Sequence, residues 1–393
     1  MELSLLALFL IAGLASLFMA WVIGAGSSGA TPFAPAVGAN AISTMRAALV
    51  VGVLGLAGAV TQGANVSEAV GRGLIGGVTL PVTGVITVLL IGAGLMAIGI
   101  RTGYPIATAF TVTGSVIGVG LALGGSPVWP KYLEIGTVWV LTPFVGGGIA
   151  YAIASVLPRP DVPERYSIAL LAGVVAAVLA NVEFGFLGPG GSAGSLATAL
   201  RRFLGLETTV ALAAITVFVA VTVGVVVSWD IRRDEAGGLR RVLLSLGSLV
   251  AFSAGASQVG LAVGPLLPIL DDTLVTSFAV LVGGGLGILV GSWTGAPRMI
   301  KSLARDYSSL GPRRSIAALV PSFLIAQLAV LLGVPVSFNE IVVSAIIGSG
   351  AAVGGSDAIS ARKILVTVGA WLASFGVAFV LGYGSIVVLT TVS

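Results

Sequence analysis

The stretch GAGSSGAT at residues 24–31 closes a long apolar segment, and GYP follows it at residues 103–105. The related stretches AGASQVG, at residues 254–260, and GVP, at residues 333–335, occupy the same places after one constant shift along the sequence, which carries Ser27 to Ser257. Small, polar and helix-breaking residues at corresponding places in two hydrophobic halves are typical of the binding site of a secondary transporter. The repeated stretches therefore predict a polytopic membrane protein built from two structural repeats.

The composition places most of the chain in lipid. Its 393 residues are 57% hydrophobic and 9% charged, with a mean hydropathy of +1.12, whereas about a quarter of the residues in a soluble domain are charged. The sequence contains no cysteine and no histidine, which excludes disulfides, thiolate chemistry and the commonest general base and metal ligand. No pairing of a nucleophile with a base is recognisable, so we expect neither an enzyme nor a bound cofactor or metal.

About 12 apolar segments approach the roughly 20 residues that a helix needs to cross a bilayer. They lie at residues 3–25, 44–62, 80–99, 105–124, 136–156, 167–184, 207–228, 240–258, 274–292, 314–333, 338–355 and 364–390. The expected fold class is therefore an all-α polytopic membrane protein with about 12 spans and with broken or re-entrant helices at the membrane midplane.

The basic residues predict the orientation of the chain. Placing the N-terminus outside puts 15 of the 19 Lys and Arg residues in cytoplasmic loops, as the positive-inside rule favours. The four that remain outside are Arg72, Lys131, Arg201 and Arg202. We expect a multi-pass protein of the cell membrane with both termini extracytoplasmic. Because the formal charge of +4 comes from these loops, it does not predict a nucleic-acid partner.

The constant shift between the repeated stretches also predicts inverted topology. It pairs Ser27 with Ser257, Pro35 with Pro265, Gly103 with Gly333, Pro105 with Pro335, Ile117 with Ile347, Gly118 with Gly348 and Gly120 with Gly350. The halves begin at the first and eighth spans, and this odd offset makes them cross the membrane in opposite senses. Chance matching between glycine-rich segments is the alternative. The expected division is a first repeat at 1–125, connecting spans and loops at 126–239, a second repeat at 240–360 and a C-terminal span at 361–393.

The repeated stretches supply the candidate binding residues. Proline and glycine interrupt residues 26–43, so the hydroxyls there either satisfy a broken backbone or face a substrate. Each G-x-P sequence precedes a predicted helix start, where free N–H groups and the helix dipole favour an anion. The predicted substrate-binding residues are Ser27, Ser28, Thr31, Thr108, Ser257, Gln258, Ser337 and Asn339.

Glu340 lies in or beside an apolar span, where a charged side chain costs at least about 2.5–3.5 kcal/mol. An intramembrane carboxylate is a candidate to bind a cation or carry a proton. The alternative is that Glu340 lies at the end of a loop and is hydrated.

These residues resemble the inorganic phosphate transporter (PiT) family of sodium- or proton-coupled permeases. The family carries a duplicated signature like G-x-N-D-x-A-N, to which SSGAT at 27–31 and GASQVGL at 255–261 correspond. Its second duplicated element, like G-x-P-x-S-T-T-H, corresponds to GYPIAT at 103–108 and GVPVS at 333–337. The resemblance covers essentially the whole chain and implies phosphate as the substrate and a sodium ion or proton as the coupling ion.

The chain departs from this family pattern at the ion site. Ser28 and Gln258 occupy the positions of the family's aspartates, which help to hold sodium ions. Both are neutral, which removes the charge that draws a cation into a site of low dielectric constant, although their oxygens remain available as ligands. Hydroxyl positions of the family are taken by Ala107, Ala109, Phe338 and Asn339, and its histidines by Phe110 and Glu340. The candidates for binding the coupling ion are Ser28, Gln258 and Glu340.

The sequence thus predicts an ion-coupled permease for inorganic phosphate that works by alternating access, with phosphate and the lipid bilayer as its partners. Two alternatives stay open: a permease for sulfate or another oxyanion, and a non-transporting sensor or structural membrane protein of the same fold. The oligomeric state, including a homo-oligomer, is also left open.

Overall fold

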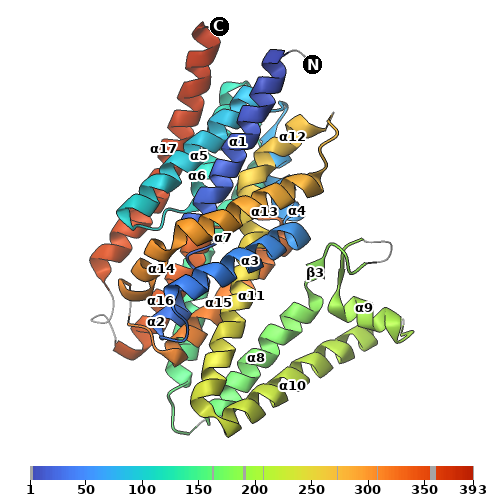
Figure 1. Ribbon diagram of the computed structural model, residues 1–393, viewed down its shortest axis with the longest axis vertical. Coiled ribbons are helices and arrows are strands. Elements are labelled where there is room, and N and C mark those ends of the chain that lie inside the picture. Colours follow the sequence, from blue (N-terminus) through green and yellow to red (C-terminus); the bar gives the residue numbers. More distant parts are fainter. Residues whose placement is uncertain are drawn as a thin grey trace.

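Long apolar helices make up most of the protein in the computed structural model (Figure 1). The structure describes residues 3–161, 163–188, 192–206, 208–271, 273–307, 309–354 and 360–392. Ten helices in this part of the chain are long and apolar enough to cross a membrane. They are α1 (Leu3–Gly26), α3 (Thr44–Gln62), α5 (Val82–Thr102), α7 (Trp129–Val156), α8 (Glu164–Asn181), α10 (Thr209–Arg233), α11 (Glu235–Val263), α13 (Ser277–Thr294), α15 (Pro312–Leu332) and α17 (Ala361–Val392).

Two shorter apolar helices, α6 (Thr108–Ala122) and α16 (Phe338–Gly354), bring the set to the number expected. Each predicted segment overlaps one of these helices, with ends that differ by up to seven residues, and positions 207 and 355 lie outside the described residues. The prediction of an all-α polytopic membrane protein is confirmed. Helices satisfy their own backbone hydrogen bonds, which lipid cannot do for them.

Short elements connect these helices. They are α2 (Ala34–Gly38), α4 (Ala64–Arg72), α9 (Leu196–Phe203), the 3₁₀ turn η2 (Gly264–Leu266), α12 (Leu267–Leu270), α14 (Ala296–Arg305) and the two-residue strands β1 (Ile75–Gly76), β2 (Ser126–Pro127), β3 (Glu183–Phe184) and β4 (Gly194–Ser195). Strand β1 pairs antiparallel with β2, and β3 pairs antiparallel with β4. Helices α8, α9 and α10 project to one side of the bundle, and the two termini lie at the same end (Figure 1).

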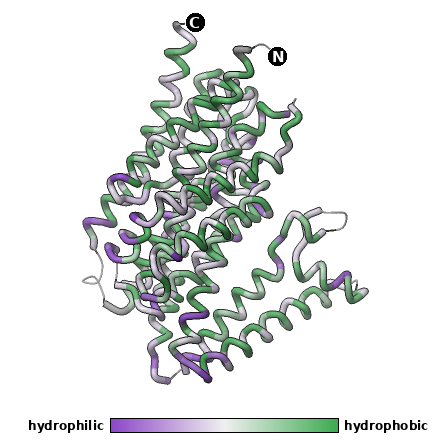
Figure 2. The backbone as a smooth tube through the Cα atoms, viewed as in Figure 1, coloured by the Kyte–Doolittle hydropathy of each residue, from purple (hydrophilic) through white to green (hydrophobic). Residues whose placement is uncertain are grey.

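The outward face of the bundle is apolar. Helix α10 exposes Val217, Phe218 and Val221 at 58–70% of their surface. Figure 2 shows hydrophobic residues along the helices, with the hydrophilic ones mainly at helix ends and loops. Such a surface is stable only against lipid or another apolar partner.

The two short helices are covered reciprocally. Helix α7 follows α6 in sequence but packs along α16, whereas α17 follows α16 and packs along α6. Gly118 of α6 approaches the backbone of α17 at Phe379, and Gly348 of α16 approaches the backbone of α7 at Gly147. A Cβ atom at either glycine would collide with a backbone carbonyl, so only glycine permits these crossings. The paired positions Gly118 and Gly348 therefore occupy equivalent places in the two halves.

A second paired position ends the helices that precede α6 and α16. Gly103 follows α5 with φ 76°, and Gly333 follows α15 with φ 60°. Glycine adopts this left-handed conformation without a steric cost, and it is the usual residue at a helix C-terminus. Residues 104–107 and 334–337 then run without helical structure to the starts of α6 and α16.

The two small-residue stretches differ in one respect. Helix α1 ends at Gly26, and residues 27–33 form turns before α2. The second stretch is regular helix through Ser257 and Gln258, and α11 breaks only at Gly264-Pro265. Pro32 explains the difference, because it follows the first stretch directly and Ala262 stands at its paired position, whereas Pro35 has its counterpart in Pro265.

Candidate functional site

All eight predicted substrate-binding residues lie in the interior of the protein. Each is at most 1% exposed. Ser27, Ser28 and Thr31 lie in the turn after α1, and Thr108 is the first residue of α6. Ser257 and Gln258 lie on α11, whereas Ser337 and Asn339 flank the start of α16. Hydrogen bonds of Gln258 and Asn339 join several of these segments directly.

Gln258 connects the turn of the first half to the G-x-P loop of the second. Its Oε1 accepts a hydrogen bond from the Ser27 hydroxyl at 3.3 Å. Its Nε2 donates to the Val336 carbonyl at 2.7 Å and lies 3.4 Å from the Ser257 hydroxyl. Both ends of the amide are thus engaged, which fixes its orientation.

Asn339 makes the opposite connection, from the second half to the first. Its Nδ2 donates to the Gly26 carbonyl at the end of α1, at 3.2 Å, and to the Ile106 carbonyl at 2.7 Å. These two carbonyls belong to the first small-residue stretch and the first G-x-P segment. The structure therefore brings together the repeated sequences of the two halves, which lie far apart along the chain.

Two of the predicted hydroxyls donate to nearby backbone. The Ser28 hydroxyl donates to the Ile23 carbonyl at 3.4 Å, and the Thr31 hydroxyl donates to the Ser27 carbonyl at 3.1 Å. Their protons satisfy the broken end of α1, and only their lone pairs remain available. Of the two roles expected for these hydroxyls, to satisfy a broken backbone or to face a substrate, Ser28 and Thr31 have the first in this structure.

Unpartnered polar atoms gather at the starts of the two short helices. Among the described residues, buried side-chain atoms without a hydrogen-bond partner include Thr108 Oγ1, Ser337 Oγ, Asn339 Oδ1 and Glu340 Oε2. A buried polar group left unpaired costs about 1–3 kcal/mol. The first N–H groups of α6 and α16 belong to these same two helix starts, and helix starts of this kind favour anions. The cluster can therefore bind a ligand that offers both acceptors and donors.

Glu340 is buried rather than hydrated. Its side chain lies in the first turn of α16 and is 2% exposed, so it is not at a solvated loop end. At the paired position in α6, Phe110 stacks on Trp139 with ring centroids 3.8 Å apart. The two halves thus differ at this paired position, where the first half has an aromatic ring and the second has a carboxyl group.

Two tryptophans that sequence reasoning missed hold the G-x-P loops. Trp139 of α7 donates its Nε1–H to the Pro335 carbonyl at 2.8 Å, and Trp371 of α17 donates to the Pro105 carbonyl at 2.7 Å. The loop before α16 is therefore fixed by α7, and the loop before α6 is fixed by α17. Their spacing is the sequence signal that could have identified them. Trp139 and Trp371 are separated by nearly the same number of residues as Ser27 and Ser257.

Trp139→Phe and Trp371→Phe are each expected to lower the thermal stability of the protein. Each change keeps a large ring but leaves a proline carbonyl without its donor, at a cost of about 1–3 kcal/mol. Thermal unfolding of the purified variants measures the effect. Trp293→Phe is the matched control, because Trp293 Nε1 donates to Leu49 at a site where the side chain is 41% exposed. Equal losses in all three variants would contradict a special role for the crossed pair.

Comparisons with known proteins agree with this geometry. The model of the phosphate transporter family matches residues 23–382. A predicted phosphate permease of Thermococcus kodakarensis is 27% identical over 362 residues, which cover 86% of each chain. The chloroplastic inorganic phosphate transporter 2-1 of Arabidopsis thaliana is 25% identical over 92% of this chain and 68% of its own length. The solved structure of a sodium-dependent phosphate transporter superposes with a TM-score of 0.82 at 23% identity, covering 98% of this chain and 100% of that one. This last likeness is one of fold.

Proposed function

Because the chain belongs to the phosphate transporter family, we propose that it carries inorganic phosphate across the membrane by alternating access. The observation that carries the proposal is the cluster of unpartnered polar atoms at the starts of α6 and α16. Thr108 Oγ1 and Ser337 Oγ supply donors to phosphate oxygens, and the helix N-termini supply free N–H groups. Helices α7 and α17 cover these starts crosswise, so rocking of one half against the other would move both loops together.

The unpartnered acceptor at the site favours phosphate over sulfate. Asn339 Nδ2 is fully used by two backbone carbonyls, so its Oδ1 is presented as an acceptor. Phosphate at neutral pH keeps a P–OH group that can donate to this oxygen. Sulfate has no proton to donate, and a site built to accept a hydrogen bond disfavours an analogue that lacks the donor.

Isothermal titration calorimetry of the purified protein with phosphate, and separately with sulfate, tests this assignment. We expect phosphate to bind at least about tenfold more tightly than sulfate, since one buried hydrogen bond is worth about 1.4 kcal/mol or more. Thr108→Val and Ser337→Ala are expected to weaken phosphate binding by a similar factor each. Equal affinity for the two anions would support the oxyanion permease instead. Absence of binding to folded protein would support the non-transporting alternative.

Glu340 is the proposed carrier of the coupling proton. It is buried beside the proposed phosphate site, and one of its oxygens has no partner. A carboxylate there repels phosphate, whereas a protonated carboxyl group donates to it, so the proton and phosphate would bind together. Ser28 and Gln258 remain the candidates for a sodium ion, because their polar hydrogens are donated to protein groups and their oxygens keep lone pairs for a cation.

Glu340→Gln is therefore expected to abolish acceleration of phosphate uptake by an inward proton gradient. The amide resembles the protonated carboxyl group, so exchange of phosphate without a gradient is expected to continue. Uptake into proteoliposomes with a pH gradient, compared with exchange at equal pH, measures both. An undiminished response of Glu340→Gln to the proton gradient would contradict this role, and a response to sodium alone would assign the coupling to sodium.

A further inference from the structure

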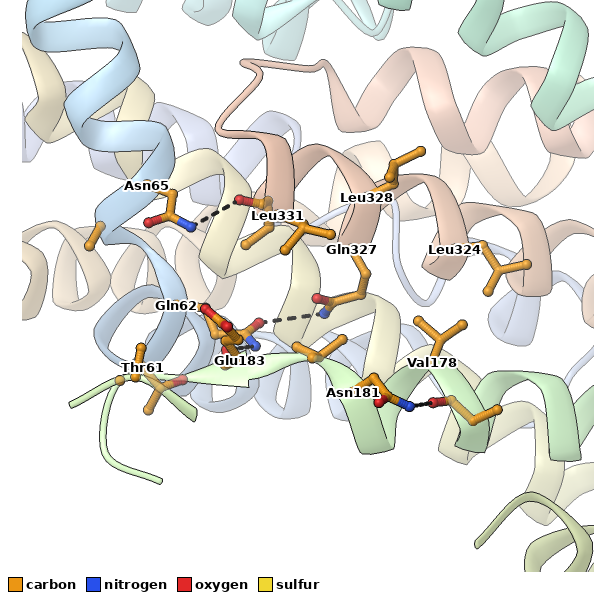
Figure 3. Close-up of a pocket in the computed structure, with 16 residues that line it drawn as sticks. Thr61, Gln62, Asn65, Val178, Asn181, Glu183, Leu324, Gln327, Leu328 and Leu331 are labelled. Carbon is orange, nitrogen blue, oxygen red and sulfur yellow. Dashed lines mark hydrogen bonds between the residues drawn. The ribbon is translucent and has the colours of Figure 1, made fainter. Parts of the chain in front are cut away.

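A cavity of about 570 Å³ lies between α8, α15 and the junction of α3 with α4 (Figure 3). Its wall is mostly apolar, with a few polar side chains. The polar lining residues are Thr61, Gln62, Asn65, Asn181, Glu183 and Gln327. Apolar cavities of about 300–1,000 Å³ with a few convergent polar groups are the usual binding sites of small molecules. None of the described lining residues belongs to the phosphate site proposed above, so this cavity would bind a different ligand.

The polar and apolar parts of the wall lie at opposite ends of the cavity. Helix α3 ends at Gln62 and α8 ends at Asn181, and both helices are long and apolar enough to cross a membrane. Figure 3 shows Gln62 and Glu183 at one end of the cavity. Val178 of α8 and Leu324 of α15 lie at the other end, on earlier turns of their helices. The ends of membrane-spanning helices lie near lipid head groups, whereas earlier turns lie among acyl chains. The cavity therefore has the polarity of a lipid molecule.

The cavity opens on an apolar surface of the bundle. Leu328 and Leu331, which line it from α15, are 54% and 62% exposed. Exposed leucines on a membrane-spanning helix are stable against acyl chains. A lipid molecule can therefore enter the cavity sideways from the bilayer, without passing through water.

Gln327 presents a buried acceptor at the cavity wall. Its side chain is only 3% exposed. Its Nε2 donates to the Ser253 hydroxyl at 2.6 Å, and Ser253 in turn donates to the Leu249 carbonyl at 2.8 Å. Because the Ser253 proton is already used, its oxygen must accept from Gln327, which fixes the orientation of the amide. The Oε1 atom of Gln327 is then buried without a hydrogen-bond partner. Such an atom is costly to leave unpaired, so the cavity favours a ligand that donates a hydrogen bond to it.

Two further amides at the polar end offer donors. Gln62 Nε2 donates to the Glu183 carbonyl at 2.6 Å. Asn65 Nδ2 donates to the Val330 carbonyl at 3.4 Å. Each amide group carries two N–H bonds, so one of Gln62 and one of Asn65 stay available to a ligand. A hydroxyl group both donates and accepts, so a head group with several hydroxyls satisfies all three amides.

The charges of the wall disfavour an ionic head group. None of the described lining residues is basic, and Glu183 is the single acidic residue among them, so an anionic group is repelled and finds no cation. An ammonium group placed against the buried Gln327 Oε1 loses its hydration, which costs far more than burying a neutral hydroxyl. We propose that this cavity binds a membrane lipid with an uncharged, hydroxyl-bearing head group. One hydroxyl donates to Gln327 Oε1, and the acyl chain lies toward Val178 and Leu324.

Photo-crosslinking in phosphatidylcholine nanodiscs tests the proposal, with a diazirine-bearing monoacylglycerol as the probe. The glycerol head of this probe is uncharged and carries hydroxyl groups. We expect crosslinks, located by mass spectrometry, on the turns of α8 and α15 around Val178 and Leu324. Excess monoolein is expected to compete with the probe. Lysophosphatidylglycerol and lysophosphatidylethanolamine with the same oleoyl chain are expected to compete at least about tenfold less well.

Two variants test the two ends of the cavity separately. Gln327→Leu removes the buried acceptor and is expected to reduce crosslinking at these turns about tenfold. Val178→Phe fills the apolar end and is expected to reduce crosslinking while the amides stay in place. Val174→Phe, one turn earlier on α8, is the matched control, because Val174 is 42% exposed and does not line the cavity. The control is expected to crosslink as wild type does, and thermal unfolding checks that each variant is folded.

Unchanged crosslinking in both folded cavity variants would overturn the proposal, as would labelling spread evenly over the lipid-facing helices. Equal competition by either charged lipid would overturn the uncharged head group. Because no phosphate is present, none of these results bears on the phosphate assignment. Loss of phosphate binding in the calorimetric experiment would likewise leave the lipid site standing.

Discussion

Asn339→Leu is expected to reduce phosphate uptake by about a hundredfold or more, the equivalent of roughly 2.7 kcal/mol. Leucine has the same branched arrangement of side-chain heavy atoms but cannot donate to the carbonyls of Gly26 and Ile106. Each bare carbonyl costs about 1–3 kcal/mol in the buried site, so the end of α1 and the start of α6 are expected to shift apart. The variant also lacks the oxygen that is proposed to accept the phosphate proton.

Uptake of labelled phosphate into proteoliposomes measures this loss, with thermal unfolding as the check that the variant is folded. Ser349→Ala is the matched control on the same helix, because its buried hydroxyl donates only to the Ile346 carbonyl at 3.0 Å. The control is expected to keep uptake within about threefold of wild type, since its hydrogen bond is worth about 1 kcal/mol and lies within one helix. A folded Asn339→Leu protein with normal uptake would remove Asn339 from the site.

Gln258→Leu is expected to reduce phosphate uptake by about tenfold or more and to lower the melting temperature. The change leaves the Ser27 hydroxyl without its acceptor and the Val336 carbonyl without its donor. Together these losses amount to about 2–6 kcal/mol if the site does not rearrange. Part of this cost appears as instability, and part as misplacement of the loop that carries Ser337.

Gln258→Glu separates a positioning role from a merely structural one. Glutamate keeps an oxygen for Ser27, but its carboxylate cannot donate to Val336. When protonated, the same side chain can do both. We therefore expect uptake by this variant to recover as the pH falls and the carboxyl group takes up a proton, relative to wild type at each pH. Uptake that stays equally low at every pH would argue that Gln258 does not act through its bond to Val336.

The sequence predicted the frame of the fold because that frame depends on local and repeated signals. Runs of apolar residues located the ten helices long enough to cross a bilayer, and the two shorter apolar helices, in the described part of the chain. Gly103 and Gly333 both end their helices in the left-handed conformation, so the paired G-x-P sequences have the same backbone turn. The domain boundaries drawn after residues 125 and 360 stay predictions. Helix α7 packs along α16 and α17 packs along α6, which makes α7 and α17 equivalent helices of the two halves. This equivalence favours grouping α7 with the first repeat and α17 with the second.

What the sequence could not provide was the partner of each polar atom. Residue type and spacing indicated that Ser28, Thr31 and Asn339 were candidates, but not that the two hydroxyls donate to nearby backbone while Asn339 bridges the halves. Burial of Glu340 depends on how α16 is covered, which no local pattern specifies.

Phosphate uptake by the wild-type protein in proteoliposomes is the most direct test of the account. The account predicts saturable uptake of labelled phosphate that excess phosphate suppresses, that equimolar sulfate suppresses much less, and that Asn339→Leu loses. Folded wild-type protein that takes up no phosphate under a sodium gradient, a proton gradient or both would contradict it.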